Sequence, residues 1–223
     1  MSDNLYRESP LTKFLAEEFT AGDPAEAGVY LFERAFMGHI NLRGEQSDQA
    51  FTKAAASVLG VALPLEPNTV ADGQYVTALW LGPSEWLLLT APDGQHEMAK
   101  ALQKALGNIS SAVTDVSGGQ TIINIRGPHA RDVLSKGCTL DFHPMVFGPG
   151  QCAQTNIAKA TVTIRKVDDS PSYDIIVRRS FADYLASWLQ DAVLEYGVVV
   201  ITQSGEQPLP PVGRIPEPNG TTC

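Results

Sequence analysis

The stretch Ile40-Asn41-Leu42-Arg43-Gly44 returns as Ile123-Asn124-Ile125-Arg126-Gly127, about 83 positions further along the chain. Each copy runs into a helical pattern, then two strand-like runs, then a second helical pattern. Such self-similarity indicates one supersecondary unit that is used twice. The sequence therefore predicts an α+β fold of pseudo-duplicated β-α-β-β-α units over residues 29–202, with halves of about 29–110 and 111–202.

In the first copy, Ile40 and Leu42 alternate with polar residues as in a half-buried strand, which ends at Gly44. Ser47 is the expected N-cap of a helix that Gly60 closes. A hairpin of strands 75–80 and 86–90, with its turn at 82–84, and a helix over 96–106 follow.

The second copy begins with a strand over 121–126, and Pro128 suits the first position of the next helix. Ser180 is the expected N-cap of the last helix, with Asp183 at N3. Its predicted buried stripe is Phe181, Leu185, Trp188, Leu189 and Val193. Further strands are expected at 154–158, 161–166, 173–177 and 198–202.

Two flanking segments lie outside the repeat. Residues 1–28 form an N-terminal arm in which Leu11, Phe14, Leu15 and Phe19 share one helical face. Packing against its own domain is the expected use of this arm, with contact to a partner as the alternative. Residues 203–223 form a Pro/Gly-rich C-terminal tail, expected to be disordered in isolation or extended along a partner.

The composition limits the class of protein. A net charge of −9 repels phosphate backbones and anionic lipid, so we expect no nucleic-acid partner and no membrane role. Apolar runs are far shorter than the roughly 20 residues that span a bilayer. Three cysteines form no disulfide framework and no leader pattern precedes the fold, so a cytoplasmic chain with reduced thiols is predicted.

Motifs of catalysis and of phosphate binding are missing. Neither G-x-x-x-x-G-K-[ST] nor G-x-G-x-x-G occurs. Ser117 precedes two glycines as in a nucleophile elbow, but Asp115 stands where that elbow needs glycine. A turn between two strands is the favoured interpretation of Ser117-Gly118-Gly119.

Metal-binding and acid–base candidates are equally sparse. Cys138, His143 and Cys152 are the one soft-ligand cluster, yet their spacing lacks the close pair typical of zinc sites, so no metal ligand is assigned. Cys223 lies in the tail and is expected to be a free thiol. The histidines, His39, His96, His129 and His143, show no recurrent spacing to carboxylates.

Arg178 and Arg179 stand beside Ser180 at the start of a helix, where guanidinium groups and the helix dipole attract carboxylates or phosphates. A surface or interfacial salt bridge is the favoured interpretation of this pair.

Several longer stretches together resemble the gamma subunit family of heterotetrameric sarcosine oxidase. The match covers most of the chain from about residue 63 to 197. Its segments are Trp80–Leu88, Val113–Ser117, Asn124–Cys138, Leu140–Pro144, Phe147, Gly150–Thr155 and Val177–Leu185.

This resemblance implies a fold similar to the folate-binding domain of aminomethyltransferases such as the glycine cleavage T-protein. It also implies a complex with alpha, beta and delta subunits that oxidises sarcosine to glycine, releases hydrogen peroxide and passes a one-carbon unit to tetrahydrofolate. FAD, FMN, NAD and folate are then expected on the larger subunits and Zn on the delta subunit, with no cofactor bound by this chain alone.

The folate pattern itself is changed in this sequence. The strand Ser172–Arg179 departs from the Gly-Tyr-Glu-like strand of the aminomethyltransferases, although Asp115, Asp141 and Asp174 leave acidic candidates for a pterin. We therefore assign no catalytic, cofactor-binding or metal residue. The leading hypothesis is a non-catalytic assembly subunit. The alternative is a stand-alone folate-dependent aminomethyltransferase or folate-binding protein, with Arg178 and Arg179 holding the glutamate tail.

Overall fold

The computed structural model describes residues 7–12, 20–21 and 27–201 of the chain. It is an α+β fold with two sheets, of five and seven strands. The chain forms two compact units, one over Met37–Ser117 and one that combines the segment before residue 37 with the segment after Ser117. The expected single domain over 29–202 and its flanking boundaries stay a prediction.

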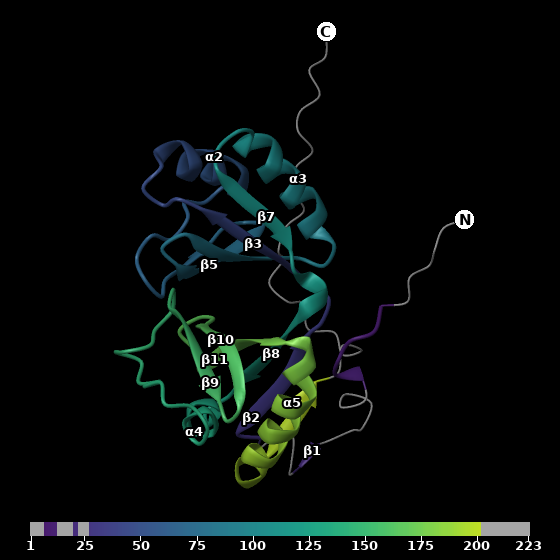
Figure 1. The fold of residues 1–223 in the computed structure, drawn as a ribbon. Helices are drawn as coiled ribbons and strands as arrows, with labels where there is room; N and C mark the ends of the chain where they lie inside the picture. The colour runs from purple at the N-terminus through teal and green to yellow at the C-terminus, as the bar shows by residue number, and fades with distance from the viewer. Residues whose placement is uncertain (1–6, 13–19, 22–26, 202–223) are drawn as a thin grey trace, which may run out of the picture. The chain divides into compact units, whose positions relative to one another are not determined.

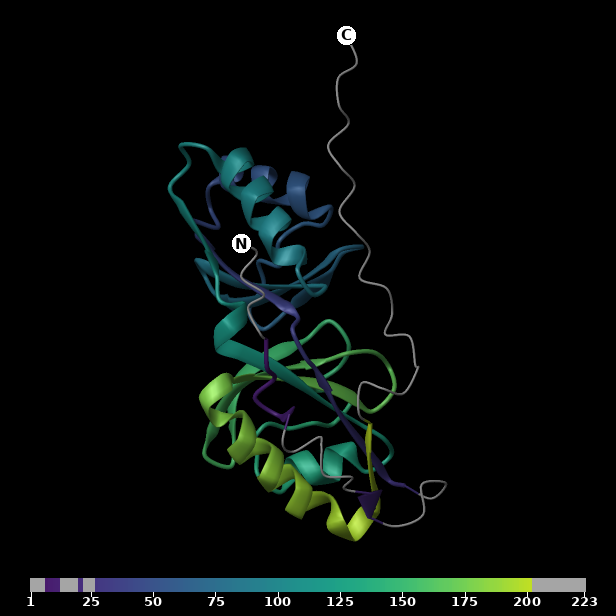
Figure 2. The ribbon, with the colours of Figure 1, turned by 90° about the vertical axis from the view of Figure 1, so that its right-hand side faces the viewer.

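The first unit is a five-stranded antiparallel sheet with the order β4-β5-β6-β3-β7. Helices α2 and α3 lie together on one face of it (Figure 2). Phe51 of α2 and Trp86 of β6 are fully buried there, with ring centroids 5.6 Å apart. The elements are β3 Gly38–Gly44, α2 Gln49–Leu59, β4 Val70–Asp72, β5 Val76–Gly82, β6 Glu85–Thr90, α3 Gly94–Leu106 and β7 Ser111–Asp115.

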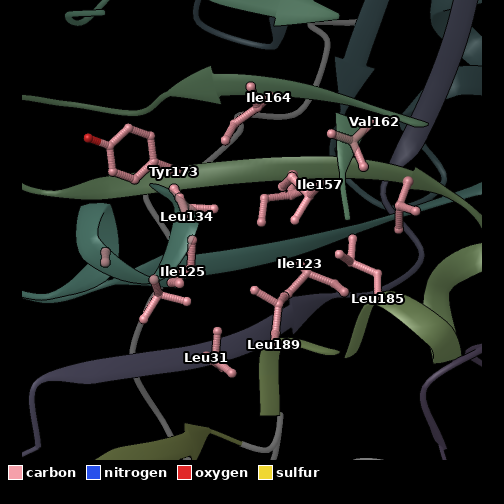
Figure 3. Close-up of a cluster of buried hydrophobic side chains, with 14 of the residues drawn as sticks. Leu31, Ile123, Ile125, Leu134, Ile157, Val162, Ile164, Tyr173, Leu185 and Leu189 are labelled. Carbon is pink, nitrogen blue, oxygen red and sulfur yellow. The ribbon is translucent and has the colours of Figure 1, made fainter. Parts of the chain in front are cut away.

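The second unit is a seven-stranded sheet with the order β1-β12-β2-β8-β11-β10-β9 (Figure 1). Figure 3 shows the core on its helix-covered face, where Leu31, Ile123 and Ile125 of the sheet meet Leu185 and Leu189 of α5. The elements are β1 Thr20–Ala21, β2 Val29–Arg34, β8 Gln120–Arg126, α4 Ala130–Ser135, β9 Cys152–Ile157, β10 Ala160–Lys166, β11 Ser172–Arg178, α5 Arg179–Val193 and β12 Val198–Ile201.

The duplication seen in the sequence is present in the strand order. In the first copy β4-β5-β6-β3 is followed directly by β7, whereas in the second β9-β10-β11-β8 is followed by β2 and only then by β12. The strand β2, which precedes the first repeat in the sequence, is thus inserted into the sheet of the second. It pairs antiparallel with β8 and parallel with β12.

Two helix starts and one buried position differ from the prediction. Asp48, not Ser47, is the N-cap of α2, and its Oδ1 accepts the Ala50 amide at 2.8 Å. Arg178, not Ser180, is the N-cap of α5 and provides no side-chain cap. The helix therefore starts two residues earlier. Phe181, expected in the buried stripe, is exposed, while Ala182 and Ala186 take buried positions.

Two further expectations concern α4 and the arm. Pro128 lies before the N-cap His129 of α4, so it is outside the helix and not at its first position. Leu11 is buried in the core of the second unit, which agrees with an arm packed against its own domain. Phe14, Leu15 and Phe19, and the tail from residue 203, lie outside the described residues.

The glycines that end the two repeated strands are required for different reasons. A Cβ on Gly44 would lie 2.3 Å from the Phe51 ring, so the small residue allows α2 to pack closely. Gly127 has a φ of 121°, and a Cβ there would lie 2.5 Å from the backbone oxygen of Gly28. The repeated glycine thus allows close helix packing in the first copy and an unusual backbone conformation in the second.

Candidate functional site

A buried charge network lies in the seven-stranded sheet, and its centre is Asp174 of β11. The Asp174 carboxylate accepts Arg34 Nη1 at 2.6 Å and Arg165 Nε at 3.0 Å on Oδ2, and Asn124 Nδ2 at 2.7 Å on Oδ1. Because alternate residues of a strand face opposite sides, these side chains lie opposite the core residues Ile123 and Ile175. The network links four adjacent strands, β2, β8, β11 and β10.

The carboxylate of Asp174 is fully buried and stays ionised. Burial alone would raise its pKa, but the charges of Arg34 and Arg165 and the hydrogen bond from Asn124 hold that pKa below the ordinary value. Three side chains of its own chain engage both oxygens, and the residue is 0% exposed, so the carboxylate presents no surface to a pterin. A negative group held this way is neither a poised acid nor a poised base.

Asp115 brings two other sequence candidates together. Ser117 Oγ donates to its Oδ1 at 2.6 Å, and His96 Nδ1 lies 3.8 Å from its Oδ2. In a catalytic triad the serine must contact the histidine, which then takes its proton. Here the carboxylate stands between them, and Ser117 lies in a 3₁₀ turn that joins β7 to β8, as the sequence predicts.

The soft-ligand cluster does not form a metal site among the residues that the structure describes. Cys138 and Cys152 are buried free thiols, and Cys138 Sγ lies 3.5 Å from Thr155 Oγ1. His143 is exposed in the segment that joins α4 to β9, where its backbone amide donates to Asp141 Oδ1 at 2.9 Å. Asp141 is thereby used in a turn.

His39, His129 and Arg179, which are further candidates from the sequence, have structural partners. His39 is buried, with Nδ1 2.9 Å from the Met37 oxygen, and the His129 ring stacks on Tyr196 with Nδ1 2.7 Å from Asp132 Oδ2. Arg178 and Arg179 are exposed at the start of α5, and Arg179 Nη2 donates to the Glu8 oxygen at 2.7 Å.

An exposed apolar tip was not predicted from the sequence. It consists of Met145, 91% exposed, and Val146, 53% exposed, in the segment between α4 and β9 that projects from its unit (Figure 1, left). Hydrogen bonds from the Val146 and Phe147 amides to the His143 oxygen, at 2.8 and 2.9 Å, fix the turn. Buried Phe142 and Phe147 anchor it through edge-on ring contacts.

The tip has an exposed apolar surface on an ordered turn. When a partner covers a large apolar side chain on such a turn, little backbone entropy is lost, and the burial adds a hydrophobic contribution that exceeds the loss of rotamer freedom. The run Phe142–Phe147 mixes inward and outward apolar residues without a helical or strand period, which is why periodicity gave no signal for it.

Comparison with known proteins identifies the family. Residues 43–195 match the model of the sarcosine oxidase, gamma subunit family. The chain belongs to this family. Gamma subunits of sarcosine oxidase from Corynebacterium sp. (strain P-1) and Arthrobacter sp. are 36% and 35% identical to it over 191 residues, which are 85% of this chain and 91% of each relative.

Solved structures agree with that assignment. A chain of the heterotetrameric sarcosine oxidase from Corynebacterium sp. U-96, in complex with pyrrole 2-carboxylate, is similar with a TM-score of 0.77 and 32% identity, covering 85% of this chain and 96% of that one. The glycine cleavage system aminomethyltransferase T from Bartonella henselae shares the fold, with a TM-score of 0.61 at 14% identity over 86% of this chain and 58% of that one. The predicted likeness to the T-protein fold is therefore confirmed.

The helices of the described part are short or polar in relation to a bilayer-spanning helix. None of them combines the length and the hydropathy needed to cross a bilayer.

Proposed function

We propose that this chain is a non-catalytic assembly subunit of a heterotetrameric sarcosine oxidase. The complex would oxidise sarcosine to glycine with release of hydrogen peroxide and transfer of the one-carbon unit to tetrahydrofolate. FAD, FMN, NAD, folate and Zn would be bound by its alpha, beta and delta subunits, and the complex would act in the cytoplasm without nucleic-acid or membrane partners.

The observation that carries this proposal is the contrast between a buried charge network, which offers no ligand site, and an exposed apolar tip. Asp174, one of the acidic candidates for a ligand, is fully buried and accepts hydrogen bonds from Arg34, Arg165 and Asn124. Met145 and Val146 are held outward on an ordered turn. A buried polar network without a ligand site, together with an exposed apolar tip, is typical of a protein that binds other proteins.

Co-expression tests the proposal. The chain, tagged, is expressed with its neighbouring coding sequences and purified, and the eluate is examined by visible absorption and by sarcosine-dependent peroxide release. We expect a yellow complex with larger subunits and with oxidase activity, while the chain expressed alone is colourless and inactive. A colourless chain that elutes alone from the co-expression would contradict the assembly role.

Titration with folate distinguishes the assembly role from the alternative of a stand-alone folate-binding protein. The purified full chain is titrated with tetrahydrofolate, with and without the substitution of Arg178 and Arg179 by alanine. The assembly proposal expects no saturable binding in either case. Saturable binding that is lost in the double variant would favour the alternative and overturn a purely structural role.

A further inference from the structure

The strand β7 has one paired edge and one open edge. It pairs antiparallel with β3, with Leu42 opposite Val113 and Ile40 opposite Asp115. Within the described ranges, no other strand of the five-stranded sheet pairs with β7, which ends the strand order. Four of its five residues are exposed, and only Val113 is half-buried, packed against the core of this unit.

The hydrogen-bond pattern between β7 and β3 shows which backbone groups of β7 face the open edge. The Val116 amide donates to the His39 oxygen at 2.9 Å, so the residues that exchange hydrogen bonds with β3 are 112 and 114. Gly44, which lies opposite Ser111, donates its amide to the Ser84 oxygen at 3.2 Å, on the β6 side. The pair of Gly44 and Ser111 therefore exchanges no hydrogen bonds, as the alternation along an antiparallel pair requires. The N–H and C=O groups of Ser111, Val113 and Asp115 therefore point away from the sheet.

The second copy shows what the corresponding strand does when its edges are used. There β2 occupies the place of β7, antiparallel to the first strand of the repeat, and its outer edge pairs with β12, which in turn pairs with β1. The same structural unit thus accepts added strands at this position. In the first copy the position beyond β7 is open among the described residues.

Open edges in natural sheets are commonly blocked by charged side chains, especially lysine, by proline, by a bulge or by very short length. At the opposite edge of this sheet β4 is only three residues long. The five residues of β7 include neither lysine nor proline, and their pairing with β3 has no register shift. The edge therefore has the backbone groups needed to pair with another chain, and Asp115 at its end is the one charged side chain in the strand.

We propose that the open edge of β7 binds an extended segment of another subunit of the complex, which adds a strand to the sheet. This inference rests on the assembly role proposed above. The segment would place an apolar side chain beside Val113, at the margin of the core, and a basic one near the exposed carboxylate of Asp115. A second copy of the chain is disfavoured because each copy carries a net charge of −9.

Amide hydrogen exchange, read at single residues in the purified complex and in the free chain, tests this pairing. In the free chain we expect slow exchange at Ala112 and Thr114 and fast exchange at Val113 and Asp115. In the complex, exchange at Val113 and Asp115 should slow by about tenfold or more, since each gains a strand hydrogen bond. Unchanged fast exchange at both residues in an intact, active complex would overturn the added strand and leave the assembly role standing.

A pair of variants adds a second readout. Val113→Pro removes an outward N–H without removing a hydrogen bond to β3, and Val113→Thr keeps that N–H with a similar branched shape. In co-expression, the proline variant should recover at least about tenfold less complex than the threonine variant. Equal recovery of yellow complex from both variants would contradict the proposal. Failure of the unmodified chain to form any complex would instead contradict the assembly role.

Discussion

Asn41 and Asn124 occupy the same position in the two repeats, and each donates a 2.7 Å hydrogen bond to a carboxylate on the neighbouring strand. The carboxylate is Glu85 in the first copy and Asp174 in the second. Glu85 pairs with Arg43, whose side chain is 60% exposed, whereas Asp174 is fully buried with two arginines. One ancestral pattern thus gives a solvated ion pair in one sheet and a buried network in the other.

This contrast predicts different costs for equivalent substitutions. Asp174→Asn leaves Arg34 and Arg165 buried without their counter-ion, which should lower the free energy of unfolding by about 3–5 kcal/mol. Glu85→Gln, the matched control in the first copy, should cost no more than about 1 kcal/mol because its pair is exposed. Urea denaturation of the full chain measures both. Similar losses for the two variants would show that the buried network contributes no more than a surface pair.

The buried carboxylate also predicts a pH dependence of stability. The pKa of Asp174 in the folded chain lies below its ordinary value of 3.8, so its stabilising contribution is complete above that value and is lost as pH falls through the folded pKa. The difference in unfolding free energy between the wild-type chain and Asp174→Asn should therefore be constant above about pH 5 and should narrow in more acidic solution. Urea denaturation at a series of pH values measures it. A difference that widens in acid would have the wrong sign.

The sequence predicts those features of the fold that depend on neighbouring residues, and it does not predict those that depend on pairing between distant segments. The repeat, its hairpins and its long helices follow from apolar periodicity and from glycines such as Gly60, which are local features. The insertion of β2 between β8 and β12 depends on pairing between distant segments, and the sequence gives no local sign of it.

The same reason explains what was missed in the candidate site. Asp174 was singled out as an acidic candidate, but its partner Arg34 lies 140 positions away and reaches it only after β2 joins the sheet. Ser180 was expected to cap α5 because serine favours that position, yet the strand β11 runs directly into the helix through Arg178. Tertiary pairing, which propensity does not contain, decided both outcomes.

The exposed tip predicts an effect on assembly and not on folding. Replacing Met145 and Val146 together by serine removes apolar surface worth about 1.5–3 kcal/mol for each side chain that a partner fully buries, so recovery of the complex should fall by about tenfold or more. The free chain should unfold within about 0.5 kcal/mol of wild type. Pull-down yield and urea denaturation measure the two effects.

A control for the tip comes from the other unit. Leu65 is 46% exposed as a single apolar side chain, and Leu65→Ser should leave recovery of the complex unchanged. If the double variant of the tip assembled as well as Leu65→Ser, the tip would not be a contact surface.

The repeated glycine gives the last prediction. In Gly127→Ala the added Cβ meets the Gly28 oxygen at 2.5 Å, and the residue must keep a φ of 121° that alanine rarely adopts. The conformational strain alone should cost about 1–2 kcal/mol. The backbone contact adds to this cost because the Gly28 amide is itself hydrogen-bonded to the Tyr196 oxygen at 2.9 Å.

Gly118→Ala is the matched control. Its Cβ would meet nothing within 4 Å and its φ lies outside the left-handed region, so its effect should stay within about 0.5 kcal/mol. Thermal unfolding of the full chain compares the two, and an equal melting temperature for both variants would mean that the turn after β8 relaxes to accept a side chain.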